Sequence, residues 1–166
     1  DYLEASGVRF DGGWVYGDIA FNHAPFFSPK MYRALIKPAH VRQIAWFKAR
    51  GLPVIYHTDG DFRLILPDLI DAGVDCFQPL EAKAHMDIRE LKPQYGARVS
   101  WMGNIDVMVL ITNDRARIEA EVAAKLPVAK AGGGYIYHSD HSIAPGVRWE
   151  TYQFLMQLLD RYGSYA

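Results

Sequence analysis

The stretch Pro53-Val54-Ile55-Tyr56-His57-Thr58-Asp59-Gly60-Asp61 decides how the rest of the sequence is interpreted. A short apolar run ends in a histidine, two carboxylates and a glycine, which is typical of a buried strand that carries polar groups at its carboxyl end. His57 and Asp59 are two residues apart, so in strand geometry both side chains point to the same side. We therefore expect one shared ligand site at this strand end.

The composition is that of an ordinary globular protein. Of the 166 residues, 50% are hydrophobic and 22% are charged, and the formal net charge is -1. With Lys and Arg scattered along the chain, this balance predicts neither nucleic-acid binding nor attachment to a membrane. Cys76 is the only cysteine, which excludes an internal disulfide or a metal cage built from cysteines and favours a cytoplasmic location.

Predicted strands and helices alternate five times after residues 1–13, where we expect the end of a helix and a turn. Strands are expected at residues 14–19, 53–57, 74–78, 98–102 and 135–137. Helices are expected at residues 31–48 with an interruption at Pro38, 62–71 with a break at Pro67, 87–96, from 113 or 114 to the glycines at 132–134, and 148–162. This alternation is typical of parallel strands with helices packed outside them.

All five expected strands end in polar residues. These are Asp18 and Asn22; His57, Asp59 and Asp61; Gln78 and Glu81; Asn104 and Asp106; and His138, Asp140 and His141. The carboxyl ends of parallel strands share one rim, so we expect these side chains to converge on a single site.

Five strand and helix units do not close an eight-stranded barrel, which usually needs about 250 residues. An open sheet of five units would expose barrel-lining side chains and two strand edges. We expect the last five units of a (β/α)8 TIM-type barrel rather than a small open sheet, because no Gly-rich dinucleotide loop is present. Residues 1–166 would then be a single domain that is the C-terminal part of a longer protein.

The order of motifs from about Trp14 to Leu159 resembles the C-terminal half of the uroporphyrinogen decarboxylase superfamily. The resemblance rests on Gly17-Asp18, Ser28-Pro29, Lys37-Pro38, His57-Thr58-Asp59-Gly60, Ala72-Gly73-Val74-Asp75, Gln78-Pro79-Leu80-Glu81, Gly103-Asn104-Ile105-Asp106 and Asp140-His141-Ser142-Ile143. It implies a (β/α)8 barrel with one of two activities. One branch decarboxylates the acetate side chains of uroporphyrinogen without a cofactor, in porphyrin synthesis. The other comprises zinc-dependent methyltransferases that move methyl groups between corrinoid proteins, thiols and methylated substrates.

The resemblance also implies a metal site. In the methyltransferase branch the strand that matches residues 53–57 ends in His-x-Cys-Gly, and a second cysteine follows the last strand, so one histidine and two thiolates hold zinc. Here Asp59 stands in place of the first cysteine and His141 near the second. We therefore expect His57, Asp59 and His141 to bind zinc, with Fe or Mn as alternatives. Glu81 is expected as a fourth ligand or a neighbouring acid.

The remaining polar residues are expected to contact substrate or to serve the fold. Asp18, Gln78, Asn104 and Asp106 are expected at the substrate, although Asn104 and Asp106 equally suit hydrogen bonds to loop backbone. Asp61 and Asp87 are predicted helix caps, and Cys76 is expected to be buried and inert. Strand aromatics are expected in the core first and in the pocket wall second: Trp14, Tyr16, Trp101, Tyr135 and Tyr137.

The favoured function is metal-assisted methyl transfer, with a corrinoid protein or a thiol as the methyl carrier. The alternative is cofactor-free decarboxylation of a tetrapyrrole that His141 and Asp18 position. A third possibility is a non-catalytic fragment whose exposed strand edges bind a partner, either an N-terminal barrel half or a second copy of the chain.

Overall fold

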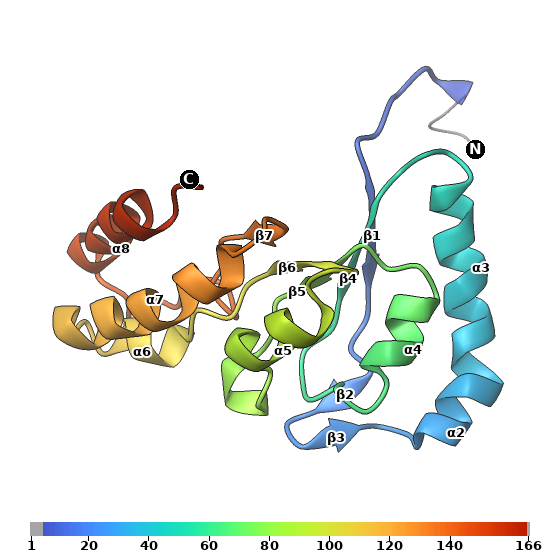
Figure 1. The fold of residues 1–166 in the computed structure, drawn as a ribbon, viewed down its shortest axis with the longest axis horizontal. Helices are drawn as coiled ribbons and strands as arrows, with labels where there is room; N and C mark the ends of the chain where they lie inside the picture. Colours follow the sequence, from blue (N-terminus) through green and yellow to red (C-terminus); the bar gives the residue numbers. More distant parts are fainter. Residues whose placement is uncertain (1–4, 166) are drawn as a thin grey trace.

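The structure, a computed structural model, describes residues 5–165. Its centre is a sheet of five parallel strands in the order β1-β4-β5-β6-β7 (Figure 1). The strands are β1 (Gly13–Tyr16), β4 (Val54–His57), β5 (Cys76–Gln78), β6 (Ser100–Met102) and β7 (Tyr135–Ile136). Each strand pairs with the next along the chain, as in a barrel wall, whereas a doubly wound sheet reverses its order at a switch point. The predicted parallel α/β architecture is confirmed.

Helices connect the strands of the sheet. They are α2 (Pro29–Met31), α3 (Lys37–Lys48), α4 (Leu66–Asp71), α5 (Ile88–Tyr95), α6 (Val107–Ile111), α7 (Arg115–Lys130) and α8 (Trp149–Tyr162), with a hairpin of β2 (Ala20–Phe21) and β3 (Ala24–Pro25) after β1. No helix between residues 5 and 165 has both the length and the apolar character needed to cross a membrane. Of the helix end and turn expected over residues 1–13, residues 1–4 lie outside the described residues, while Ala5 is helical and Ser6 and Gly7 form a turn.

Proline determines where two helices begin or change pitch. The helix expected over residues 31–48 continues past Pro38 because a π-helical segment, Tyr32–Ile36, precedes α3 and makes room for a residue that has no N–H to donate. Helix α4 begins at Leu66, not at Phe62, because Pro67 fits only in the first turn of a helix. The prediction that Asp61 caps this helix is therefore wrong.

The carboxylates expected as caps elsewhere are confirmed, and one helix was not expected. Asp87 caps α5 by accepting from the Arg89 N–H, and Asp114 caps α7. Asp61 instead accepts from the Arg63 N–H in the turn before α4 and forms an ion pair with the Arg63 guanidinium. Helix α6 lies where the sequence analysis expected only a strand exit, and Asp106 caps it.

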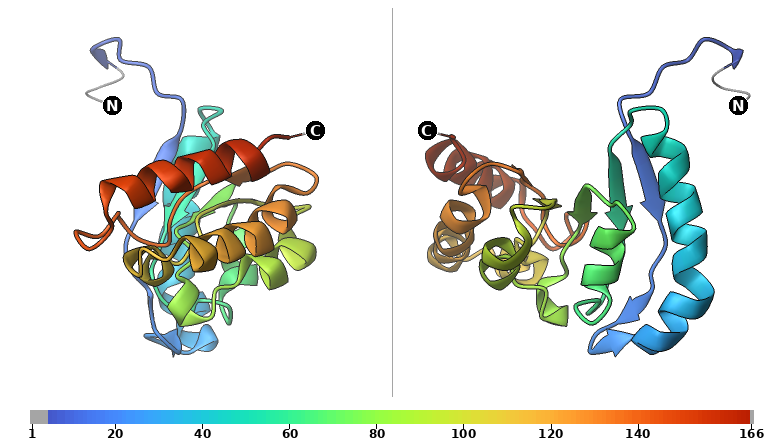
Figure 2. Two further views of the ribbon diagram at one scale, coloured as in Figure 1. Left: turned by 90° about the vertical axis from the view of Figure 1, so that its left-hand side faces the viewer. Right: turned by 45° about the vertical axis from the view of Figure 1, so that its right-hand side comes forward.

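The two faces of the sheet differ in what covers them. Side chains alternate along a strand, so Val15, Tyr56, Phe77 and Trp101 point to the side on which the helices pack and are buried in the core. On the opposite, concave face Trp14 and Tyr16 are 50% and 75% exposed. Figure 2 shows helices following the outer side of the strands while the inner side stays open. Strands and helices thus form an arch, as expected of part of a barrel wall.

At the rim, the exits of β5 and β6 are in close contact. The Asn104 N–H donates to the Pro79 carbonyl at 3.0 Å, and a Cβ on Gly103 would lie 1.7 Å from the same oxygen. Gly103 also has a φ of +133°, which disfavours any other residue. These two strand exits therefore approach as closely as they do only because residue 103 is glycine.

Gly103→Ala should lower the free energy of unfolding by about 1–3 kcal/mol more than Gly132→Ala. Gly132 also has a positive φ, +70°, but open space where its Cβ would lie, so alanine there incurs only the conformational cost of about 1–2 kcal/mol. At Gly103 the overlap with Pro79 is added. Urea unfolding of the two variants gives the comparison, and equal losses would contradict the packing argument.

Candidate functional site

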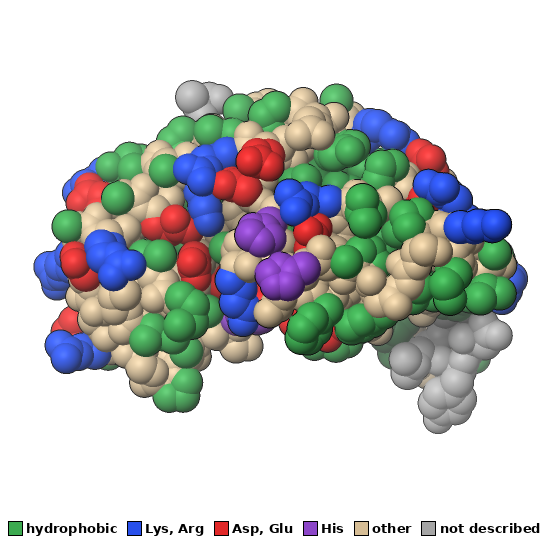
Figure 3. Space-filling view, turned by 90° about the horizontal axis from the view of Figure 1, so that it is seen from below, with side chains coloured by type: hydrophobic (Ala, Val, Ile, Leu, Met, Phe, Trp, Pro, Cys, Tyr) green, Lys and Arg blue, Asp and Glu red, His purple; other side chains and the backbone are tan. Residues whose placement is uncertain are grey.

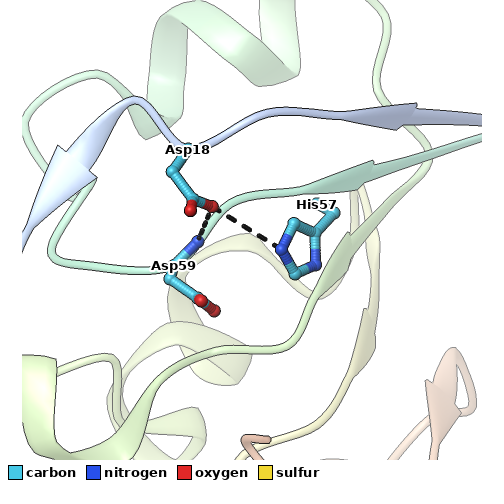
Figure 4. A group of neighbouring side chains, drawn as sticks. All are labelled: Asp18, His57 and Asp59. Carbon is cyan, nitrogen blue, oxygen red and sulfur yellow. Dashed lines mark hydrogen bonds and ion pairs between the residues drawn. The ribbon is translucent and has the colours of Figure 1, made fainter.

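Asp18, His57 and Asp59 come together at the ends of β1 and β4 (Figure 4). The strand register pairs Tyr16 with His57, which brings Asp18 beside Asp59 two residues further on. Oδ1 of Asp18 accepts from the Asp59 N–H at 3.0 Å and lies 3.6 Å from Nε2 of His57. One potential ligand atom from each of the three residues lies within 4.8 Å of the other two.

The ring of His57 is held in one orientation. Its Nδ1 lies 2.5 Å from Oε1 of Gln78, the residue opposite it on β5. An amide oxygen only accepts, so Nδ1 is the donor to Gln78 and Nε2 is the ring nitrogen that faces Asp18. The expected substrate-binding residue Gln78 thus orients His57.

Two buried atoms of this group have no hydrogen-bond partner among the described residues. They are Nε2 of His57 and Oδ1 of Asp59, and His57 is only 7% exposed. Leaving such atoms unpaired is unfavourable. One imidazole nitrogen with carboxylate oxygens suits zinc, iron(II) or manganese, so the donor set fits a divalent cation.

His141 and Glu81 form a second pair of imidazole and carboxylate. Nε2 of His141 lies 3.3 Å from Oε1 of Glu81, whose other oxygen accepts from the Gly60 N–H at 2.8 Å. Burial opposes ionisation of Glu81, but the Gly60 hydrogen bond and the ion pair with Lys83 outweigh it and hold the pKa below its ordinary value. The structure therefore groups Asp18, rather than the expected His141, with His57 and Asp59.

Burial raises the pKa of two other carboxyl groups here. For Asp59, burial is the main cause, and the nearby His141 and His57 offset it only in part. For Asp140, which is 1% exposed, burial outweighs the hydrogen bonds from the Val107 and Ala82 backbone. A bound cation would stabilise the ionised form of these carboxyl groups, which their burial disfavours.

A cavity of about 230 Å³ opens beside this group. Among the residues that line it are Tyr16, His57, Asp59, Pro79, His138 and His141. Figure 3 views the molecule from the side on which the chain leaves β1, and histidine side chains lie near the middle of this face, with acidic and basic side chains around them. The strand exits therefore do converge, with β1 and β4 on one side of the cavity and the loops after β5 and β7 on the other.

Asn104 and Asp106, expected at the substrate, do not line this cavity. The Asn104 side chain is completely buried and accepts from the Ile88 N–H while it donates to the Leu80 and Met86 carbonyls. The Asp106 carboxylate accepts from the Met108 N–H. Both residues therefore satisfy loop backbone, the role that the sequence had left open for them.

The sequence analysis placed Asp140 in the polar cluster after the last strand without a role of its own, and its first expectation, that Tyr16 lies in the core, is wrong because Tyr16 lines the cavity and is 75% exposed. The Asp140 carboxylate accepts from the Ala82 N–H at 3.0 Å and the Val107 N–H at 2.8 Å, and so joins the exits of β5, β6 and β7. Tyr16 stacks on His57, with ring centroids 3.9 Å apart and planes 3° apart. Tyr16 and Asp18 are two residues apart, as are His57 and Asp59. Because side chains alternate along a strand, this matched spacing indicates that all four side chains point to the same side.

Comparison with known proteins identifies relatives of the chain. The family model described as uroporphyrinogen decarboxylase (URO-D) matches residues 16–162. Curated proteins named uroporphyrinogen decarboxylase are 38% identical over 101 residues in Pseudomonas fluorescens and 30% identical over 134 residues in Pelobacter propionicus. A solved structure described as a methyltransferase from Methanosarcina mazei superposes with a TM-score of 0.66 at 22% identity, which shows a shared fold.

This chain matches only part of each of these proteins. The alignments cover 61% of it and 27% of the Pseudomonas protein, and 81% of it and 38% of the Pelobacter protein. The superposition covers 83% of this chain and 39% of the Methanosarcina chain. The chain therefore spans about a quarter to two fifths of the length of the proteins that it matches.

Asp140→Ala should destabilise the fold by about 2 kcal/mol or more, because two buried backbone N–H groups lose their acceptor. Asp106→Ala is the matched control: it removes an exposed helix cap and should cost about 1 kcal/mol. Urea unfolding measures both. Equal losses would show that Asp140 does not hold the three loops together.

Proposed function

Because the chain belongs to the uroporphyrinogen decarboxylase family, we propose that it is the metal-binding part of a family member that transfers methyl groups. The observation that carries this proposal is the pair of buried, unpartnered atoms on His57 and Asp59 beside the Asp18 carboxylate. A bound cation would give both atoms a partner, whereas cofactor-free decarboxylation would require the substrate itself to pair them.

In this proposal Asp18, His57 and Asp59 hold a divalent cation, with zinc the expected metal. The bound metal would act as a Lewis acid on the heteroatom that carries or receives the methyl group. Gln78 fixes the orientation of the His57 ring through the contact at Nδ1, so that Nε2 faces Asp18. The protein thus supplies a preformed ligand set and does not reorganise its imidazole on binding.

The transfer itself breaks one bond and forms another. The bond between the methyl carbon and the donor heteroatom breaks, that heteroatom keeps the bonding electrons and takes up a proton, and the carbon bonds to a thiolate or a reduced corrinoid. His141, which lines the cavity and contacts the Glu81 carboxylate, is placed to supply the proton. The Glu81 carboxylate, whose pKa is held below its ordinary value, orients the His141 ring at the cavity.

The second candidate is decarboxylation of uroporphyrinogen, which the printed names of the curated relatives favour. A substrate that carries several acetate groups calls for cationic side chains. Within the described part of the chain the cavity is lined by neither Lys nor Arg, and nearby Lys83 is paired with Glu81. Charge complementarity therefore favours methyl transfer.

Metal analysis tests the proposal. Purified protein reconstituted with zinc should hold close to one equivalent by inductively coupled plasma mass spectrometry, and His57→Ala should abolish binding. Asp18→Asn should weaken zinc affinity at least tenfold, because it removes an anionic ligand, whereas His141→Ala should retain the metal. His23→Ala, which changes an exposed histidine, is the control.

Other outcomes of the same measurement discriminate between the alternatives. Loss of zinc in His141→Ala but not in Asp18→Asn would restore the ligand set expected from the sequence. Absence of binding by the unmodified protein would exclude the metal-assisted route and favour decarboxylation.

A further inference from the structure

Strand β1 presents two aromatic side chains to the concave face of the sheet. Trp14 and Tyr16 lie two residues apart and so share a side, and they are 50% and 75% exposed. Both line the cavity that also contains His57 and Asp59. Aromatic rings are usually well buried, so two of them side by side in a cavity provide an apolar surface for a bound molecule.

The contact between Tyr16 and His57 fixes the orientation of this surface. The two rings are stacked at 3.9 Å and are nearly parallel, so one face of the tyrosine covers the imidazole. The tyrosine nevertheless remains 75% exposed. A flat ring bound against the aromatic pair therefore lies next to the group formed by Asp18, His57 and Asp59.

Size and charge restrict what this surface can accept. The part of the cavity that this chain lines, about 230 Å³, exceeds the roughly 150 Å³ that accommodates benzene. Buried Asp140 and half-buried Asp59 line it, with no lysine or arginine among the described lining residues. A single uncharged ring fits these conditions better than a large polyanion does.

We propose that the substrate at this site is a small uncharged molecule with a planar aromatic ring, which stacks on Tyr16 and Trp14 and directs its methyl-bearing heteroatom toward His57 and Asp59. The identity of the methyl-bearing group rests on the proposed function, whereas the preference for an aromatic ring rests on the cavity. Tyr16 and Trp14 are specificity-determining residues in this assignment.

The test compares methoxybenzene with methoxycyclohexane, which carry the same uncharged methoxy group on a flat and on a saturated ring. Ligand-detected NMR titrations of the protein, with and without one equivalent of zinc, should give a dissociation constant about three- to tenfold lower for methoxybenzene, the range that ring stacking supplies. Tyr16→Phe should keep this preference and Tyr16→Leu should remove most of it. Trp149→Leu, an exposed aromatic on α8, should have no effect.

The outcomes separate this inference from the proposed function. Zinc bound through His57 together with equal affinity for the two ethers would overturn the aromatic assignment, leave metal binding intact and make Trp14 and Tyr16 a packing surface. A ring preference that Tyr16→Leu leaves unchanged would also overturn it. A ring preference without any zinc binding would support the aromatic surface and overturn the metal-assisted reaction.

Discussion

The parallel register between β1 and β4 is the constraint on which the candidate site depends. Backbone pairing places Tyr16 opposite His57, so strand alternation puts Asp18 beside Asp59 and the tyrosine ring on the imidazole. A shift of one residue would turn one of these sets to the helix-covered face. The site is therefore positioned by the main-chain pairing of β1 with β4. Strands hold side chains more rigidly than loops do.

The opposite wall of the cavity is held differently. Its residues lie in the exits of β5 and β7, which buried polar side chains join to each other and to the exit of β6. Asp140 accepts from backbone of the other two exits, and Asn104 uses its amide on the segment from Leu80 to Ile88. These side chains add to backbone hydrogen bonds between the exits, such as that from the Asp140 N–H to the Ile105 carbonyl at 2.8 Å. This wall therefore depends on individual side chains as well as on backbone pairing.

The sequence was informative where the determinants are local. Apolar runs that end in polar residues predicted five parallel strands with one common rim, and Asp87 and Asp114 were recognisable as caps from their place before helical patterns. The α4 start was mispredicted because the requirement of Pro67 outweighed an attractive cap at Asp61. The roles of Asn104 and Asp140 depend on contacts between segments distant in the sequence, so residue type alone left them ambiguous.

The pairing of Asp18 with His57 was open to prediction only in part. Asp18 was expected at the substrate because it follows a strand, but its distance from His57 follows from a register that one sequence does not specify. His141 was assigned as a ligand through the resemblance; in the structure it contacts Glu81, and its role as a ligand stays a prediction. Matching a motif residue by residue thus named candidate residues and left the partners of each side chain to the geometry.

Because the two walls of the cavity consist of different residues, the effects of substitutions on metal binding and on substrate binding can be considered separately. The atoms that suit a cation come from the carboxyl ends and exits of β1 and β4, whereas His138 and His141 lie in the loop after β7. No ladder hydrogen bond joins β7 to β1 or β4, and the link between the two sides runs from His141 through Glu81 to the Gly60 N–H. Tyr16 contributes both to the candidate metal site and to the substrate cavity, because one face of its ring contacts His57 and the rest borders the cavity. A change there acts on the orientation of the imidazole and on the fit of the substrate at once, so its effects on metal binding and on ligand choice must be measured independently.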